Sequence, residues 1–208
     1  MGRKSLQAEK QEEVLEHFAQ AIIEDGLEGA STGNVARRMG IKTSLLMHYF
    51  PNKSVMVEAV VQRMVASYEE KFLPSLSPIQ DPVDRLHHII STLVSPEWEI
   101  ADSQRLFYTC FSLIFRDQEV KKQFQTLFDQ FREFLVGELT AAMEQKAIPY
   151  QDPDDLANLI ITIIEGKGFV HSVISDVSWS VRQQKILLKL LWSIIAGKII
   201  LTQTLDET

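Results

Sequence analysis

Apolar residues recur at helical spacing along almost the whole chain, and this periodicity constrains the fold more than any other feature of the sequence. No segment alternates apolar and polar residues with turn signals at strand spacing. The pattern predicts an all-α protein with about nine helices. The expected helices cover residues 7–25, 32–39, 43–49, 53–72, 82–95, 97–116, 118–146, 153–176 and 179–204.

Capping and helix-breaking residues define the ends of the first three helices. Gly26 ends the first helix, Ser31 is a good N-cap for the second, and Gly40 ends the second. Pro51 breaks the third. Residues 73–82 are dense in proline and lack helical continuity, so we expect a hinge there.

Composition excludes several classes of protein. The 208-residue chain is 45% hydrophobic, which is enough for a packed core. Neither a signal peptide nor a run of roughly 18 apolar residues is evident, so we expect a cytoplasmic protein with no membrane partner. Cys110 is the single cysteine, which excludes an internal disulfide and a multi-cysteine zinc site. We expect it to be buried filler rather than a reactive thiol.

Charge is unevenly distributed along the chain. The formal net charge is -7, which is unfavourable for nucleic-acid binding. Residues 29–57, however, contain Arg37, Arg38, Lys42, Lys53 and His48 and not one acidic residue. A local positive face can therefore exist on an acidic molecule, and ordinary sampling explains the same stretch equally well.

Two short helices joined by a glycine turn are the arrangement that a helix-turn-helix needs. Val35 and Ala36 pack inward, Gly40 makes the turn, and Ile41 anchors it. On spacing alone, a generic helical hairpin is the commoner explanation of this pattern.

The specific residues change that balance. Residues 26–53 read GLEGASTGNVARRMGIKTSLLMHYFPNK, and this string resembles the DNA-binding domain of the tetracycline-repressor (TetR) family. The resemblance implies a three-helix DNA-binding domain over residues 1–52. It also implies a larger helical domain over 53–208, which binds a small-molecule ligand and dimerises, with the helix at 53–72 as the connection.

The resemblance assigns roles in DNA binding to individual residues. Hydroxyl groups at the start of the first motif helix meet a phosphate, which suits the positive end of a helix. The start of the second motif helix reads base edges, and later side chains clamp the backbone. Phe50 belongs mainly to the core. The expected DNA-binding residues are Ser31, Thr32, Lys42, Thr43, Ser44, Leu45, His48, Tyr49 and Lys53.

Three positions depart from the family pattern. Lys42 stands where a capping serine is usual, Ser44 where glycine is frequent, and Met47 where a tyrosine commonly touches phosphate. None of these departures removes positive charge or the ability to form a helix. They favour an unusual operator or altered contacts rather than loss of DNA binding.

The later helices offer candidates for an effector site. Aromatic residues recur at helical spacing near residues 98–131, a pattern commoner in a core than in a cofactor site. Glu165 lies in a strongly apolar helix, where a carboxylate must be exposed, paired or in contact with a ligand, and we favour exposure or pairing. The candidate ligand-binding residues are Trp98, Phe107, Cys110, Phe111, Phe128 and Glu165.

The last two helices, near 153–176 and 179–204, are apolar on more than one face. Gly166 and Gly168 add positions where helices can approach closely, although burial within one monomer explains the same residues. Family precedent favours a homodimer through these helices, and a ligand would change the separation of its recognition helices.

Two other classes of function compete with this interpretation. The chain has no catalytic or phosphate-binding motif, so we expect no enzyme, no cofactor and no metal site. His87, His88 and the acids at 152, 154 and 155 suit helix surfaces and helix starts better than metal coordination. A helical adaptor that binds only protein is the stronger rival. Effector identity, operator sequence, target genes and the direction of regulation are not encoded in these patterns.

Overall fold

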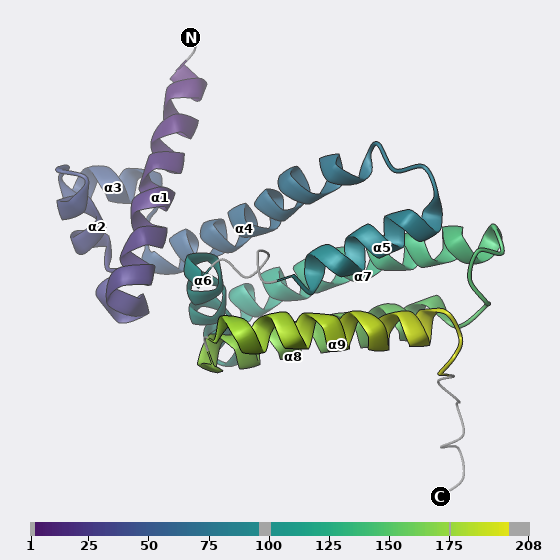
Figure 1. The fold of residues 1–208 in the computed structure, drawn as a ribbon. Coiled ribbons are helices and arrows are strands. Elements are labelled where there is room, and N and C mark those ends of the chain that lie inside the picture. The colour runs from purple at the N-terminus through teal and green to yellow at the C-terminus, as the bar shows by residue number, and fades with distance from the viewer. Residues whose placement is uncertain (1–2, 96–100, 175, 200–208) are drawn as a thin grey trace, which may run out of the picture. The chain divides into compact units, whose positions relative to one another are not determined.

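The computed structural model describes residues 3–95, 101–174 and 176–199. It is all-α over these ranges, as predicted, with nine α-helices and one 3₁₀ helix and no strand among them (Figure 1). The helices are α1 (Arg3–Gly29), α2 (Thr32–Arg38), α3 (Thr43–Tyr49), α4 (Lys53–Leu76), α5 (Pro82–Leu93), α6 (Ala101–Phe111), η2 (Ser112–Phe115), α7 (Gln118–Glu144), α8 (Pro153–Ile174) and α9 (Val177–Ile195).

The chain forms two compact units. Unit 1 consists of Met1–Lys71 and Ala101–Leu127, and unit 2 consists of Phe72–Ile100 and Phe128–Thr208. Helices α4 and α7 therefore contribute residues to both units. The boundary expected after residue 52 concerns the DNA-binding domain, and it stays a prediction.

In unit 1, α2 and α3 pack against α1 (Figure 1). The buried side chains Val14, Phe18 and Ile22 line one side of α1, as the periodicity predicted. Gly26 interrupts this helix with a φ of 71°, a left-handed conformation that glycine adopts without steric cost. The chain therefore turns at the predicted position, although one further helical turn follows it.

The turn between α2 and α3 follows the predicted chemistry. The Ser31 hydroxyl caps α2 by accepting a hydrogen bond from the Asn34 backbone N–H at 3.1 Å. Gly40 has a φ of 66° and reverses the chain after α2. The Ile41 backbone N–H then donates to the Ala36 carbonyl at 3.0 Å, which closes the turn.

Helix α4 is longer than predicted. It continues through Pro74 to Leu76, so the first part of the expected hinge is helical. A proline near the end of a helix removes a single backbone hydrogen bond, and Leu76 is fully buried in the core of unit 2. Burial of this side chain outweighs the proline signal.

Unit 2 is built around the contact faces of α5, α7, α8 and α9. Aspartates cap three of these helices: Asp81 accepts from the first N–H groups of α5, Asp152 from those of α8, and Asp176 from those of α9. The Asp176 cap explains why α9 starts before the expected residue 179. The core comprises Leu76, Leu86, Ile89, Ile90, Leu93, Val94, Leu135, Leu139, Ala142, Ile148, Leu156, Ala157, Ile160, Ile164, Leu191, Ile194 and Ile195.

Candidate DNA interface and effector domain

One side of α3 is anchored in unit 1 and the other side is exposed. Leu46 and Phe50 are buried, and their packing fixes the rotation of α3 about its own axis. The predicted base-reading residues are all exposed, which leaves their side chains available to a partner. These residues are Lys42, Thr43, Ser44 and Leu45, together with His48 of the backbone-contact group.

The residues at the start of α2 have a structural role in addition to the predicted one. Ser31 is exposed, but its hydroxyl oxygen already caps the helix by accepting from Asn34. Thr32 is half-buried. A hydroxyl has one donor and two acceptor sites, so the Ser31 O–H can still donate to a phosphate oxygen.

Lys53 is held by the protein itself. Its ammonium group donates a hydrogen bond to the Leu27 backbone carbonyl, and burial lowers the pKa of the amine. The side chain is half-buried and joins the start of α4 to the last residues of α1. Two N–H donors of the ammonium group are not used by this hydrogen bond. Tyr49 is also half-buried, with its ring edge-on to His48 at 5.7 Å.

Part of the positive charge in residues 29–57 is neutralised by α1. The Arg38 guanidinium forms ion pairs with Glu24 at 2.5 Å and with Asp25 at 2.6 Å. Hydrogen bonds from Gln20 and Arg38 hold the pKa of Glu24 below its ordinary value, and Arg38 with Asn34 does the same for Asp25. Arg38 therefore serves the packing of α2 on α1.

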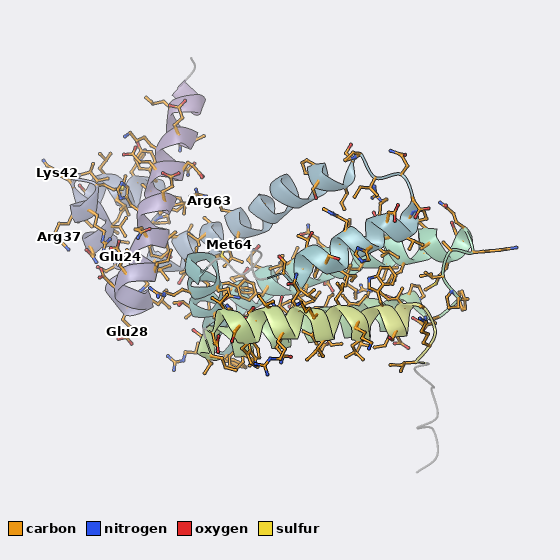
Figure 2. All side chains as sticks on the ribbon, in the orientation of Figure 1. Glu24, Glu28, Arg37, Lys42, Arg63 and Met64 are labelled. Carbon is orange, nitrogen blue, oxygen red and sulfur yellow. The ribbon has the colours of Figure 1, made fainter. Side chains whose placement is uncertain are left out.

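Arg37 is a surface cation that the sequence analysis did not include among the DNA-binding residues. It is exposed and donates to the Asn34 side chain at 2.7 Å. Figure 2 shows Arg37 and Lys42 projecting from the outer side of the α2–α3 pair, away from α1. The acid-free stretch of residues 29–57 was the signal that could have identified it.

The candidate ligand-binding residues divide between the two units. Phe107, Cys110 and Phe111 belong to unit 1, and Phe128 and Glu165 belong to unit 2. Trp98 lies outside the described residues.

The two aromatic candidates of unit 1 pack against a third aromatic ring, and Cys110 is buried. Phe107 and Phe111 each meet the ring of Phe124 edge-on, with centroids 5.4 Å and 5.1 Å apart. Such edge-to-face contacts are typical of packed aromatic cores. Cys110 is fully buried, and burial raises the pKa of its thiol to about 12. The thiol is therefore inert at neutral pH, as the sequence analysis expected.

Glu165 has the most unusual environment of the candidate residues. It is half-buried on α8, next to the buried Ile164 and one turn from the buried Gly168. Burial raises the pKa of its carboxyl to about 7. Within the described part of the chain, its carboxylate has neither a hydrogen bond nor an ion pair. This position can stabilise a bound cation, because a cation would offset the cost of burying the negative charge.

Helices α8 and α9 lie side by side (Figure 1). Both expose large apolar side chains. An added Cβ at Gly166 would meet no atom within 4 Å, so open space lies beside this glycine in the monomer. We call this region the α8–α9 apolar surface. It comprises Phe169, Val170, Val173, Ile174, Val177, Val181, Ile186 and Leu190.

Helix α8 is also long and apolar enough to cross a membrane by length and composition, and it is the one such helix among the described residues. The sequence analysis found no run of that kind. The two findings differ because Glu165 and Lys167 interrupt the apolar residues of α8, although the mean hydropathy of the helix is high.

The residues considered and rejected as metal ligands have other partners. The His87 ring stacks on Trp192 with centroids 5.5 Å apart. Asp152 caps α8, and Asp154 forms an ion pair with Arg132. These contacts agree with helix-surface and helix-start roles.

Comparisons with known proteins cover both parts of the chain. Residues 15–60 match the family model described as bacterial regulatory proteins, tetR family, and residues 81–196 match the tetracyclin repressor-like C-terminal domain. The nucleoid occlusion factor SlmA of Actinobacillus pleuropneumoniae serotype 5b is 24% identical over 184 residues, which are 88% of this chain and 90% of that protein. The regulator BetI of Serratia proteamaculans is 25% identical over 93 residues, 44% of this chain and 47% of BetI.

Solved structures share the fold at low sequence identity. A TetR transcription regulator from Haloarcula marismortui has a TM-score of 0.77 and 16% identity, over 91% of this chain and 98% of that one. A protein from Saccharomonospora viridis, described as a transcriptional regulator in complex with choline, has a TM-score of 0.79 and 17% identity, over 90% and 98%. With a helix-turn-helix in front of a C-terminal domain of this type, the chain belongs to the TetR family of DNA-binding transcriptional regulators.

Proposed function

We propose that the protein is a homodimeric repressor that acts in the cytoplasm on a palindromic operator in double-stranded DNA. The observation that carries this proposal is the outer side of α3, where Lys42, Ser44 and His48 are exposed while Leu46 fixes the helix. A helix held in this way can enter the major groove without losing its packing. The DNA-binding residues are Ser31, Thr32, Lys42, Thr43, Ser44, Leu45, His48, Tyr49 and Lys53, and we add Arg37.

The proposed dimer forms through α8 and α9. The exposed apolar residues of the α8–α9 apolar surface are grouped on two adjacent helices and are not scattered singly over the protein. A partner chain would remove this surface from water. Gly166 has open space beside it, so a helix of a second copy can approach closely there. Two-fold symmetry would then place two α3 helices on two half-sites of the operator.

The proposed effector is a small molecule bound by the C-terminal domain. Of the candidates Trp98, Phe107, Cys110, Phe111, Phe128 and Glu165, the last has the strongest support, because its half-buried carboxylate lacks a partner among the described residues. The choline complex of the Saccharomonospora viridis protein makes organic cations the first class of compound to test. Such a cation would shift the balance between dimers with different half-site spacing.

The proposal is tested by selecting bound duplexes from a random-sequence pool with the purified protein at near-physiological salt. We expect an inverted repeat with an affinity on the order of 10⁻⁸ to 10⁻¹¹ M. Affinity should fall steeply with salt, because phosphate contacts release counterions. A pool that shows no enrichment, with and without a panel of organic cations, would contradict a sequence-specific regulator and favour the protein-binding adaptor.

A second candidate function follows from the similarity to SlmA. That relative is a nucleoid occlusion factor, and the similarity extends over 88% of this chain. A protein of that kind differs from a promoter-bound repressor in where its sites lie. Mapping of the bound chromosomal sites distinguishes the two, since a repressor concentrates at promoters, whereas the alternative predicts sites independent of promoter positions.

A further inference from the structure

Two large apolar side chains are exposed on α3, in the middle of the proposed DNA interface. Leu45 is 46% exposed and Met47 is 48% exposed, while Leu46 between them is fully buried. Consecutive residues of an α-helix are about 100° apart around its axis. Leu45 and Met47 therefore lie on opposite flanks of the outer side, and about half of each side chain is open to a partner.

The chemistry of the major groove restricts what these side chains can contact. Phosphates and most base edges present charges, donors or acceptors; a leucine side chain can hydrogen-bond to none of them, and a methionine sulfur is only a weak acceptor. The C5-methyl group of thymine is the apolar feature of the groove. An apolar side chain that enters the groove is therefore favourable beside thymine and unfavourable beside the other bases.

Position along the helix distinguishes Leu45 from Met47. The N-terminal residues of a recognition helix contact the base edges. Leu45 is the third residue of α3 and follows the exposed Thr43 and Ser44, whereas Met47 is the fifth residue. Leucine also has fewer rotatable bonds than methionine, so it discriminates better between positions of a methyl group.

We propose that Leu45 is a specificity-determining residue that selects thymine at one position of each operator half-site, by packing against the thymine methyl group. This inference rests on the proposed function, because it requires that α3 enters the major groove. It adds a prediction about the operator: each half-site carries a thymine that is recognised by its methyl group and not by a hydrogen bond.

The test uses the purified protein and the duplex selected as described above. Each thymine is replaced in turn by deoxyuridine at symmetric positions of the two half-sites, which removes the methyl group and leaves base pairing unchanged. We expect one position to lose roughly fourfold in affinity per half-site, from the value of one buried methyl group, and roughly fifteenfold over both.

Variants then assign the loss to a residue. In Leu45→Ala the penalty for deoxyuridine at that position should disappear, because alanine is too short to reach the methyl group. Met47→Ala is the matched control, an apolar residue of equal exposure on the same helix, and it should keep the full penalty at that position. Lys42→Ala should weaken binding to the thymine and deoxyuridine duplexes by the same factor.

The outcomes separate this inference from the proposed function. If a duplex is selected but no deoxyuridine substitution weakens binding, the inference is overturned and the regulator stands. The same holds if the penalty persists unchanged in Leu45→Ala. If no duplex is selected, the proposed function fails and the inference fails with it. The deoxyuridine series with the unaltered protein needs no variant, so the absence of any penalty overturns the inference even if a variant misfolds.

Discussion

Two cations of the helix-turn-helix region differ in how far contacts within the protein use their charge. Arg38 is paired with Glu24 and Asp25, so its charge is largely used within unit 1. Lys53 donates to the Leu27 carbonyl but keeps two free donor positions on its ammonium group. The residue type alone did not distinguish these roles, because both depend on neighbours that are distant in sequence.

For Lys53, we predict that Lys53→Ala lowers both thermal stability and the salt dependence of DNA binding. The stability falls because the Leu27 carbonyl loses its hydrogen-bond donor at a half-buried position. The slope of log K against log salt should decrease by about 0.9 for each phosphate that the variant no longer neutralises. Thermal melting and salt titrations measure the two effects.

Lys42→Ala is the matched control for this prediction. Lys42 is exposed at the N-cap position of α3, and its side chain makes no capping hydrogen bond. We expect a lower salt slope with unchanged thermal melting. If Lys53→Ala lowered the melting temperature and left the slope intact, Lys53 would be a packing residue and would not bind phosphate.

For Glu165, we predict that Glu165→Gln removes a pH dependence of stability. Burial raises the folded-state pKa from an ordinary value of 4.5 to about 7, so the folded state binds more protons than the unfolded state between these values. Stability of the natural protein therefore falls as the pH rises from about 4.5 to about 7, and the neutral glutamine escapes this loss. The variant should gain about 2 kcal/mol at pH 8, after allowance for solvent screening.

Denaturant unfolding of both proteins at pH 5 and pH 8 measures this effect. The difference in the free energy of unfolding should be larger at pH 8. A difference that does not change with pH would mean that Glu165 ionises at its ordinary value. An organic cation that binds at Glu165 should stabilise the natural protein and leave Glu165→Gln unaffected.

At the level of helices, local signals predicted α3 well and α4 poorly. The limits of α3 follow from the Gly40 turn and from Pro51, both of which act within a few residues. The end of α4 is set by the burial of Leu76 in a core assembled from distant segments. The prediction that the helix ends at residue 72 rested on the local effect of the proline, whereas the burial of Leu76 depends on residues that are distant in sequence.

Arg85 links the end of α4 to two other helices of unit 2. Its Nε donates to Glu138 of α7 at 2.9 Å, and its Nη1 donates to the Leu76 carbonyl at 3.2 Å. A second hydrogen bond joins the same guanidinium to the Glu138 carboxylate. We predict that Glu138→Ala costs about 2 kcal/mol in the free energy of unfolding, because a partly buried guanidinium loses its carboxylate.

Glu133→Ala provides the control for this helix pair. Glu133 is exposed on the same α7 helix, and the described residues offer it no hydrogen bond or ion pair. Its removal should change stability by less than about 0.5 kcal/mol. Equal effects of the two substitutions, measured by urea unfolding, would show that the Arg85 pair contributes nothing specific.

At the level of the whole molecule, the fold class and the exposure of the start of α3 could be predicted from the sequence, and the environment of the candidate effector residues could not. Periodicity and the residues 26–53 were sufficient for the first two. The candidate ligand residues were chosen by residue type, and two of them, Phe107 and Phe111, pack against Phe124 in unit 1. Whether an aromatic residue lines a core or a ligand site depends on long-range packing, which the sequence pattern does not contain.

We predict that Phe169→Glu converts the protein to a monomer and abolishes operator binding. Phe169 lies on the α8–α9 apolar surface and is 59% exposed, so most of its side chain is open to a partner chain. A carboxylate buried without a partner in the proposed dimer would be strongly unfavourable. Sedimentation at several concentrations measures the oligomeric state.

Phe115→Glu is the control for the dimer prediction. Phe115 is 84% exposed on η2 in unit 1, outside the α8–α9 apolar surface. We expect this variant to sediment like the natural protein. If Phe169→Glu remained a dimer that bound the operator normally, the interface would have to lie elsewhere.

If the proposed dimer forms through the α8–α9 apolar surface, the abundance of the protein becomes part of its regulation. If only paired chains occupy an operator, occupancy at low abundance rises with the square of the number of chains in the cell. A twofold drop in the number of chains would then lower operator occupancy almost fourfold. Monomers would meanwhile expose the α8–α9 apolar surface to proteases and chaperones. Their degradation would lower the amount of protein further, so the regulated genes would respond with a threshold.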